Sequence, residues 1–522
     1  MSRGLVIGID SGTSSTRAIL FDARGRALAE GRRAYQVLRP RPGWVEQKAE
    51  WWWEALVGAL RDLLAAEAAD PARILGLAIT HQRITAVPVD QEVVPLRNAI
   101  LWNDVRCGEQ NQRALKTVGR ERLYQRTGYN PGIWTVYKAM WLKDNEPELY
   151  REMDKLVLVQ DYLVHKLTGE LSTTSSAAVM TGCLDVAHRH RWAEDILEEL
   201  EVRPSIWVDK VLAGGEMAGR VNKAGALATG LPEGLPVITA AGDQPCGVVG
   251  AGVTKPSLLG VNGGTSCTME TCAQTLPLDP EANYFIEISP MGTYFPENSI
   301  YSGGSALMNW LKAALGGEEE AGEDWDWEAF YSLAGQTPPG NLGLMMVPYL
   351  SGATAPYWDV DARGVLFGLS MDHSRPHLVR AVIEGLAYEV RRQTAFMEKG
   401  TGVGIEEVRM YGGSARSRLW NQVFADVLGV QVRSTRTVET TALGAAICAA
   451  AGAGLHPDIE TAAERMVQVE DEFSPDRANQ NLYDRLFKEV YGQFYDRIHD
   501  LVHQATTLAK DTAEPAAASK EN

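Results

Sequence analysis

Short apolar runs alternate along this chain with longer segments of helical spacing. Residues 5–9, 74–80 and 237–240 are almost entirely apolar, which is typical of strands buried on both faces of a sheet. Residues 50–66 instead place Trp and Leu at mostly helical spacing and predict a helix. Strands that alternate with helices in this way indicate an α/β fold.

The first strand runs into an acidic residue and a turn rich in hydroxyl groups, since residues 10–17 read DSGTSSTR. The glycine allows a tight turn that brings backbone N–H groups close to an anion, and Thr13 and Ser14 add hydroxyl donors. Asp10 can hold Mg²⁺ through water, and Arg17 is the fixed cation nearby. The pattern predicts a phosphate-binding turn; it also fits a plain β-hairpin, because the chain continues as a second strand.

Two later segments repeat the order of strand and glycine turn. Residues 258–267 lead into Gly-Gly-Thr-Ser and share Gly-Thr-Ser with the first turn, which suggests two similar domains facing one nucleotide. Residues 408–417 run from a strand through Gly-Gly and small residues into an amphipathic segment. This third pattern opens a helix N-terminus at a strand end, a favourable place for an adenosine and its phosphates.

Asp243 is a candidate general base, because it follows a buried strand and stands beside Gly242, which permits close approach. A carboxylate in such a position can orient and deprotonate an attacking hydroxyl group. A carboxylate of ordinary pKa suffices if the proton moves late in the reaction. From the residues alone, Asp243 is equally well explained as the N-cap of the following helix.

Composition limits the classes of protein that remain. A chain of 522 residues fits two domains rather than one core, and the net charge of −17 disfavours nucleic acid and anionic membranes as partners. We find no signal peptide and no apolar run long enough to cross a membrane. The six cysteines are scattered without metal-ligand spacing, so we expect reduced thiols and a cytoplasmic protein. The acidic stretch 318–326 predicts a solvated insertion.

Together these motifs resemble the actin/hexokinase/Hsp70 ATPase fold and, within it, the FGGY carbohydrate kinases, from residue 5 to about 454. Further strings carry this resemblance in order: AILWND at 99–104, AGDQ at 241–244, APYWD at 355–359, RG at 363–364, GLAY at 385–388 and TTALGAA at 440–446. It implies an α/β protein with two actin-like (ribonuclease H-like) ATPase domains around a central cleft. It also implies ATP and Mg²⁺ as cofactors, closure over both ligands, and a homodimer or tetramer.

The implied domain order places sugar binding, the first phosphate motif and the catalytic aspartate in an N-terminal domain, and nucleotide binding in a C-terminal domain. We expect these domains over residues 1–250 and 251–503. Residues 504–522 contain few large apolar side chains and predict a disordered tail.

The resemblance also assigns roles to single residues on the sugar side. Asp243 matches the catalytic base, and Gln244 follows it in the same substrate-binding motif. Arg83 matches an arginine that holds a terminal hydroxyl, and Trp102 matches a tryptophan that packs on the carbon chain. Asp104 resembles the aspartate that meets sugar hydroxyls in xylulokinases.

On the nucleotide side, the resemblance implies that Asp10 holds the metal ion. Gly304 and Asn309 resemble residues of the helix that lines the adenine and phosphates, although the Gly-Gly pair at 303–304 is equally well explained as a simple turn before a helix. The residues expected to contact the nucleotide are Thr13, Ser14, Arg17, Thr265, Gly304, Asn309, Gly413 and Ser417.

Three positions depart from the glycerol kinase pattern. Ile84 stands in place of a glutamate, Ile133 in place of a tyrosine, and Thr268 in place of a phenylalanine. Losing hydrogen-bonding partners should disfavour a triol, so we predict a four- or five-carbon ketose or polyol, above all a ketopentose such as xylulose. The two isoleucines are also explained by ordinary core packing, and a glycerol or tetritol kinase is the alternative.

Two other classes of protein share the fold. A non-catalytic sugar-sensing regulator should have lost Asp10 or Asp243, and both are present. An Hsp70-like or actin-like ATPase with a protein partner should carry a peptide-binding domain or polymer-forming insertions, and we find neither. The prediction is therefore an ATP-dependent kinase of a small sugar or polyol.

Overall fold

The computed structural model describes residues 4–316 and 327–518, and the chain divides into two compact units. Unit 1 comprises Met1–Lys255, Cys272–Pro296 and Glu439–Gln468. Unit 2 comprises Pro256–Thr271, Glu297–Val438 and Val469–Asn522. The chain therefore returns twice to unit 1 after the boundary that we predicted at residue 250.

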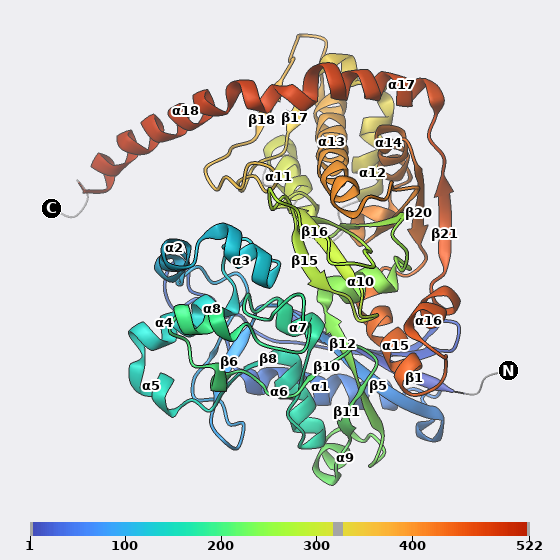
Figure 1. The fold of residues 1–522 in the computed structure, drawn as a ribbon. Coiled ribbons are helices and arrows are strands. Elements are labelled where there is room, and N and C mark those ends of the chain that lie inside the picture. The colour runs from blue at the N-terminus through green and yellow to red at the C-terminus, as the bar shows by residue number, and fades with distance from the viewer. Residues whose placement is uncertain (1–3, 317–326, 519–522) are drawn as a thin grey trace. The chain divides into compact units, whose positions relative to one another are not determined.

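A six-stranded sheet forms the centre of unit 1, in the order β11-β12-β5-β1-β2-β3 (Figure 1). β1 pairs in parallel with β5 and antiparallel with β2, β5 is parallel to β12, and the two edge strands are antiparallel to their neighbours. The strands are β1 (Leu5–Ser11), β2 (Ser15–Asp22), β3 (Ala27–Ala34), β5 (Ile74–His81), β11 (Met217–Arg220) and β12 (Pro236–Gly242). The predicted strands at 5–9, 74–80 and 237–240 are confirmed.

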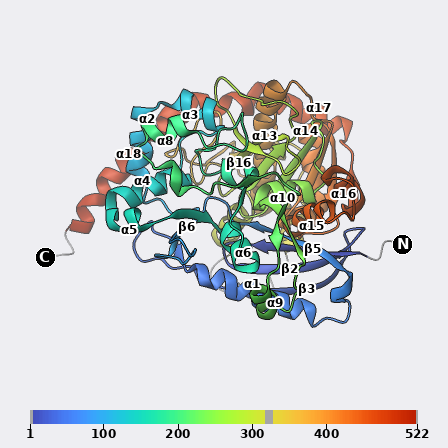
Figure 2. The ribbon, with the colours of Figure 1, turned by 60° about the horizontal axis from the view of Figure 1, so that its bottom comes forward.

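Helices cover both faces of this sheet, as Figures 1 and 2 show. One face carries α1 (Ala49–Leu64), α6 (Val159–Thr168) and α9 (Lys223–Thr229). The other carries α10 (Asp243–Gly250) and α15 (Thr440–Gly452), with α16 (Ile459–Met466) packed on α15. The helix predicted at 50–66 is α1, and its apolar side chains complete the core.

Alternation along β1 decides which helices each of its faces meets. Leu5, Ile7 and Ile9 join the core cluster that contains Trp52 of α1. Gly8 points the other way, and a Cβ atom there would come within 2.0 Å of the Ala442 carbonyl oxygen on α15. Only glycine lets this helix lie so close to the strand.

Glycines also bring α10 and α15 together. A Cβ atom on Gly444 would lie 1.9 Å from the Cys246 carbonyl oxygen, and one on Gly250 would lie 1.9 Å from the Thr440 carbonyl oxygen. The two helix backbones therefore touch directly, with no side chain between them at these points.

A second part of unit 1 holds a four-stranded sheet in the order β4-β7-β6-β8. The strands are β4 (Glu46–Gln47), β6 (Ala86–Val89), β7 (Ala99–Ile100) and β8 (Lys155–Leu158), with the short strands β9 (Thr173–Thr174), β10 (Val211–Leu212) and β15 (Phe285–Ile288) also in unit 1. Its further helices are α2 (Gly108–Thr117), α3 (Arg120–Thr127), α4 (Thr135–Asn145), α5 (Pro147–Glu152), α7 (Ser175–Val179) and α8 (Glu194–Glu199).

The sheet of unit 2 repeats the central pattern of unit 1, with its strands in the order β16-β14-β13-β19-β20-β21. β13 is antiparallel to β14 and parallel to β19, just as β1 is antiparallel to β2 and parallel to β5. The strands are β13 (Leu258–Gly263), β14 (Cys267–Thr271), β16 (Tyr294–Ile300), β19 (Glu407–Tyr411), β20 (Gln431–Thr435) and β21 (Val469–Phe473). The prediction of two similar α/β domains is therefore confirmed.

Unit 2 also contains the helices α11 (Ser305–Gly316), α12 (Trp327–Ser332), α13 (Arg375–Thr401), α14 (Arg418–Leu428), α17 (Arg477–Leu486) and α18 (Gly492–Ala518), with a small hairpin of β17 (Met345–Val347) and β18 (Val365–Phe367). Of these helices, α13 and α14 pack on strands. α18 extends through much of the segment 504–522, where we expected a disordered tail. The acidic stretch predicted at 318–326 lies outside the described residues.

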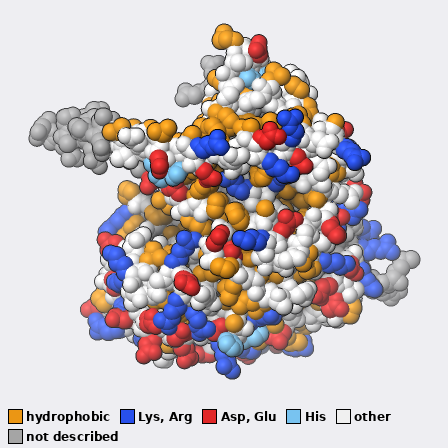
Figure 3. All heavy atoms as spheres, turned by 45° about the horizontal axis from the view of Figure 1, so that its top comes forward, with side chains coloured by type: hydrophobic (Ala, Val, Ile, Leu, Met, Phe, Trp, Pro, Cys, Tyr) orange, Lys and Arg blue, Asp and Glu red, His pale blue; other side chains and the backbone are white. Residues whose placement is uncertain are grey.

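Several features bear on partners and location. All six cysteines are buried and free. Among the described residues, no helix is both long and apolar enough to span a membrane. On the face shown in Figure 3, Lys and Arg side chains are interspersed with Asp and Glu, so neither sign of charge dominates that face.

The contact between α10 and α15 gives a test of the fold. Gly444→Ala should lower the melting temperature, because the added methyl group must force the two helices apart at a cost of roughly 1–3 kcal/mol. Gly108→Ala is the control, since nothing lies within 4 Å of a Cβ atom at that helix position. Equal melting temperatures for the two variants, measured by thermal unfolding, would contradict the packing described here.

Candidate active site

The first phosphate motif is a β-hairpin with an ion pair close to its turn. Asp10 of β1 lies opposite Arg17 of β2, and Gly12 N–H donates to the Ser15 carbonyl across the turn. Arg17 forms an ion pair with Glu439, the residue that precedes α15. The hairpin interpretation is therefore correct, and the predicted phosphate turn is its tip.

Asp10 sits in an unusual electrostatic environment. Its Oδ1 atom is buried and accepts no hydrogen bond from the described residues. Burial, followed by the negative charges of Asp243 and Glu439, raises the pKa of Asp10 from 3.8 to about 7, although Arg17 partly opposes this shift. A buried carboxylate oxygen near two further carboxylates suits a divalent cation, and the residues present therefore fit Mg²⁺.

Asp243 begins α10 directly after β12 and lies beside Arg83. Arg83 Nε is 3.1 Å from Asp243 Oδ1, while the Asp243 side chain keeps 36% exposure. Gly242 occupies the N-cap position, so Asp243 is the first residue of the helix rather than its cap. Gly242 is also needed for space, because a Cβ atom there would lie 2.4 Å from Arg83 Cγ. Gln244 is partly exposed, and its backbone N–H donates to Asp243 Oδ1.

Glu287 is a part of this site that the sequence analysis missed. It lies on β15, its side chain is fully buried, and it forms an ion pair with the Arg83 guanidinium. Arg83 therefore bridges two carboxylates, Asp243 and Glu287. The available signal was one charged residue in the otherwise apolar run 285–288, since a charge in a buried strand requires a partner.

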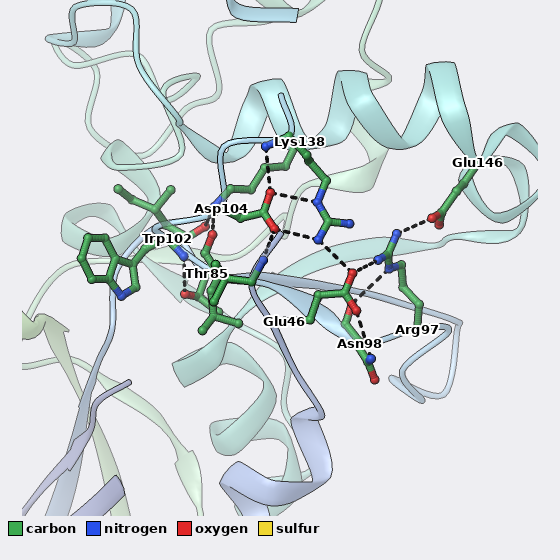
Figure 4. A network of polar contacts seen from close by, with 12 residues as sticks. Glu46, Thr85, Arg97, Asn98, Trp102, Asp104, Lys138 and Glu146 are labelled. Carbon is green, nitrogen blue, oxygen red and sulfur yellow. Dashed lines mark hydrogen bonds and ion pairs between the residues drawn. The ribbon is translucent and has the colours of Figure 1, made fainter. Parts of the chain in front are cut away.

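Trp102 and Asp104 have different environments although they are two residues apart (Figure 4). Trp102 is 41% exposed, and its Nε1 donates to Thr13 Oγ1 at 2.9 Å. Asp104 is completely buried and accepts hydrogen bonds from Val45 N–H and from Arg106. The Asp104 side chain thus helps to hold its loop, and its contact with the sugar stays a prediction.

The three departures from the glycerol kinase pattern are also buried or partly buried. Ile84 is buried with a φ of +66°, and its carbonyl accepts from Thr135 Oγ1 and Lys138 Nζ, each at 3.0 Å. Thr268 is buried in β14, and Ile133 is partly buried before α4. For the Ile84 side chain, the packing explanation fits the structure.

In unit 2, the second glycine turn packs against the start of α11. Gly304 N–H donates to the carbonyl of the exposed Thr265, and a Cβ atom on Gly304 would lie 2.0 Å from the Gly264 carbonyl oxygen. Asn309 is exposed further along α11. The Gly-Gly pair is thus a turn before a helix, and it keeps the exposed Thr265 next to that helix.

The third motif gives different results for its two predicted residues. Gly413 is exposed and follows Gly412, whose φ is +82°. Ser417 is buried and caps α14, because its side chain accepts a hydrogen bond from Trp420 N–H. A cavity of about 340 Å³ borders Gly412 and Ala415, but its lining includes none of Thr265, Gly304, Asn309 and Ser417.

Comparison with known proteins identifies the family. The N-terminal domain model of the FGGY family of carbohydrate kinases matches residues 5–250, and its C-terminal domain model matches residues 259–453. The chain belongs to the FGGY family of carbohydrate kinases. It is therefore a phosphotransferase with an alcohol group as acceptor, and the family implies ATP as a substrate.

Relatives of two kinds match this FGGY kinase over most of its length. The chain is 29% identical to a xylulose kinase of Staphylococcus epidermidis over 93% of its own length and 96% of that protein. It is 32% identical to a glycerol kinase of Koribacter versatilis over 89% of its own length and 92% of that protein. The solved xylulose kinase of Rhodospirillum rubrum has a TM-score of 0.87 at 28% identity, covering 96% of this chain and all of that one. This likeness confirms the predicted two-domain α/β fold.

The environment of Asp10 predicts how stability depends on pH in the absence of ligands. The folded kinase keeps a proton on Asp10 up to about pH 7, whereas an unfolded chain releases it near the ordinary pKa of 3.8. Ionising Asp10 in the folded state therefore costs free energy, and its contribution to stability falls as the pH rises from about 4 to about 7.

Asp10→Asn removes this cost. We expect the variant to melt at a higher temperature than the wild type at pH 8, with a smaller difference at pH 5. Thermal unfolding in Mg²⁺-free buffer measures both differences, and a difference that does not change with pH would contradict the assignment.

Proposed function

We propose that this FGGY kinase transfers the γ-phosphoryl group of ATP to a hydroxyl of a ketopentose such as xylulose. The observation that carries the proposal is the pair of Asp243 and Arg83, a partly exposed carboxylate held 3.1 Å from a guanidinium at a helix start. Xylulose kinases among both the curated relatives and the solved structures support this substrate class.

In this proposal, Asp243 orients the attacking hydroxyl and accepts its proton. The hydroxyl oxygen bonds to the γ-phosphorus while the bond from that phosphorus to the bridging oxygen of ADP breaks, and the proton passes to the carboxylate. Arg83 holds the sugar beside Asp243, and Trp102 and Gln244 complete the sugar side.

The nucleotide side would use the exposed tips of the glycine turns. Thr13, Ser14 and Arg17 in unit 1, and Thr265, Asn309 and Gly413 in unit 2, are proposed contacts. Asp10 would hold Mg²⁺, which when bound offsets the charge of the phosphates and of the nearby carboxylates. We do not extend this role to Ser417, whose hydroxyl already caps α14.

The preference for a ketopentose over glycerol rests on what surrounds Arg83. The residue after it is a buried isoleucine, and its carboxylate partner Glu287 is completely buried beneath it. A small triol would therefore lose a hydroxyl acceptor that the glycerol kinase pattern provides. The similarity to a glycerol kinase makes glycerol or a tetritol the second candidate.

Location and assembly form a separate part of the proposal. Six buried free thiols fit a reducing compartment, so we propose the cytoplasm. We also propose that the chain assembles as a homodimer or tetramer, as its membership of the family suggests.

The substrate assignment is tested by ADP release from Mg·ATP across a panel. The panel contains glycerol, erythritol, xylitol, ribitol and both enantiomers of xylulose and of ribulose. We expect one strong signal, with a ketopentose. Strong turnover of glycerol would overturn the substrate preference but not the mechanism, whereas ATP binding without turnover of any compound would favour a sugar-sensing regulator.

The role of Asp243 is tested by Asp243→Asn. Loss of the base should lower kcat by roughly 10²–10⁴-fold, while binding of ATP stays within a few-fold of the wild type. Asp195→Asn is a matched control, because Asp195 is a similarly exposed carboxylate that pairs with Arg126 away from the site. Steady-state kinetics and ATP titrations measure both effects, and near-normal turnover by Asp243→Asn would rule out the base.

A further inference from the structure

Five hydrogen bonds in unit 1 close a ring that joins residues far apart in the sequence. We call this set, Thr13, Gln47, Gln82, Thr85 and Trp102, the Gln47 ring. The bonds run from Gln47 Nε2 to the Thr13 carbonyl (2.6 Å), Gln82 Nε2 to Gln47 Oε1 (2.9 Å), Thr85 Oγ1 to Gln82 Oε1 (3.3 Å), Trp102 N to Thr85 Oγ1 (3.1 Å) and Trp102 Nε1 to Thr13 Oγ1 (2.9 Å).

Gln47 is fully buried and uses the complete hydrogen-bonding capacity of its amide. Its Nε2 donates to the Gln36 carbonyl as well as to that of Thr13, and its Oε1 accepts from Trp52 Nε1 as well as from Gln82. Two donors and two acceptors are therefore all satisfied. An aliphatic side chain could fill this space but could make none of these bonds.

The neighbouring residue on β4 serves a different network. Glu46 accepts from Arg97, Asn98 and Arg106, within the set of contacts that also holds Asp104 (Figure 4). Successive residues of a strand point to opposite faces. In this two-residue strand, Glu46 therefore anchors the loop around Trp102, and Gln47 anchors the ring.

The ring connects the two halves of the chemistry proposed for unit 1. Thr13 belongs to the phosphate turn, and Trp102 belongs to the sugar side. Gln82 directly precedes Arg83, and its own N–H is fixed to the Ser11 carbonyl at the end of β1. A shift of Thr13 must therefore displace the hydrogen bond to Trp102. It must also displace the bonds that run through Gln47 to Gln82, the residue before Arg83.

We propose that Gln47 is a positioning residue that couples nucleotide binding at the phosphate turn to sugar binding. This inference rests on the function proposed above. Phosphates that order Thr13 also fix the Trp102 indole, whose Nε1 bonds to the Thr13 hydroxyl, and the path through Gln82 to Arg83. The sugar then binds to a site that is already ordered, so each ligand strengthens the binding of the other.

The experiment measures binding of xylulose by calorimetry with and without saturating Mg·ADP. For the wild type we expect the nucleotide to tighten sugar binding by about fivefold or more. Gln47→Met keeps the volume but loses the four bonds, and Thr85→Val removes the hydroxyl that joins Trp102 to Gln82. Both variants should reduce the nucleotide effect to less than about twofold.

Gln160→Met is the matched control. Gln160 is another buried glutamine of unit 1, and it bonds to Asp161 and Thr174 rather than to the ring. We expect it to lower the melting temperature, as the ring variants do, and to leave the nucleotide effect unchanged. This separates a loss of coupling from a general loss of stability.

The outcomes distinguish this inference from the proposed function. It is overturned if the wild type binds and phosphorylates xylulose without any nucleotide effect. It is also overturned if Thr85→Val or a folded Gln47→Met keeps the full effect, or if Gln160→Met loses it. A wild type that turns over none of the panel sugars contradicts the proposed function instead.

Discussion

The candidate site of unit 1 depends on backbone contacts that only glycine permits. Gly250 and Gly444 let α10 and α15 touch, and Gly8 lets α15 lie on β1. α10 starts with Asp243, and α15 starts after Glu439. The close packing therefore brings both carboxylates near Asp10 at the end of β1, where their negative charges raise its pKa. Larger residues at the glycine positions would push β1, α10 and α15 apart and so separate the carboxylates of the site.

This packing produces an excess of negative charge that the site must balance. Helix N-termini favour the negative charges of Asp243 and Glu439. Asp10 lies at a strand end instead, where Arg17 is the cation that opposes the charges of its neighbours. Arg83 pairs with both Asp243 and Glu287, so one positive charge faces two negative charges. Burial is the main cause of the raised pKa of Asp10, and the neighbouring carboxylates raise it further. In the function proposed above, a divalent cation held by Asp10 would offset this charge.

The sequence predicted elements whose signals are local. The order of strand, turn and strand around residues 10–17 predicted the hairpin. The repeated Gly-Thr-Ser indicated a second, similar domain. Glu287 and Gln47 could not be interpreted in this way. Their roles depend on partners distant in the sequence, such as Arg83 for Glu287 and Thr13 for Gln47. Ser417 was assigned to the nucleotide through the family resemblance, and the sequence pattern did not reveal that its side chain caps α14.

Backbone strain next to Arg83 shows why the departure at residue 84 matters. A β-branched residue rarely adopts a positive φ, yet Ile84 does so at +66°. The conformation is held because Thr135 and Lys138 both donate to its carbonyl, and Lys138 also donates to the Leu101 carbonyl just before Trp102. The same lysine therefore fixes the backbone beside both Arg83 and Trp102. The Ile84 side chain is buried, so the residue of this turn that we propose to contact sugar hydroxyls is Arg83, whose guanidinium pairs with Glu287. Selectivity in this kinase is therefore expected to respond to the residues that orient Arg83 as strongly as to those that would touch the sugar.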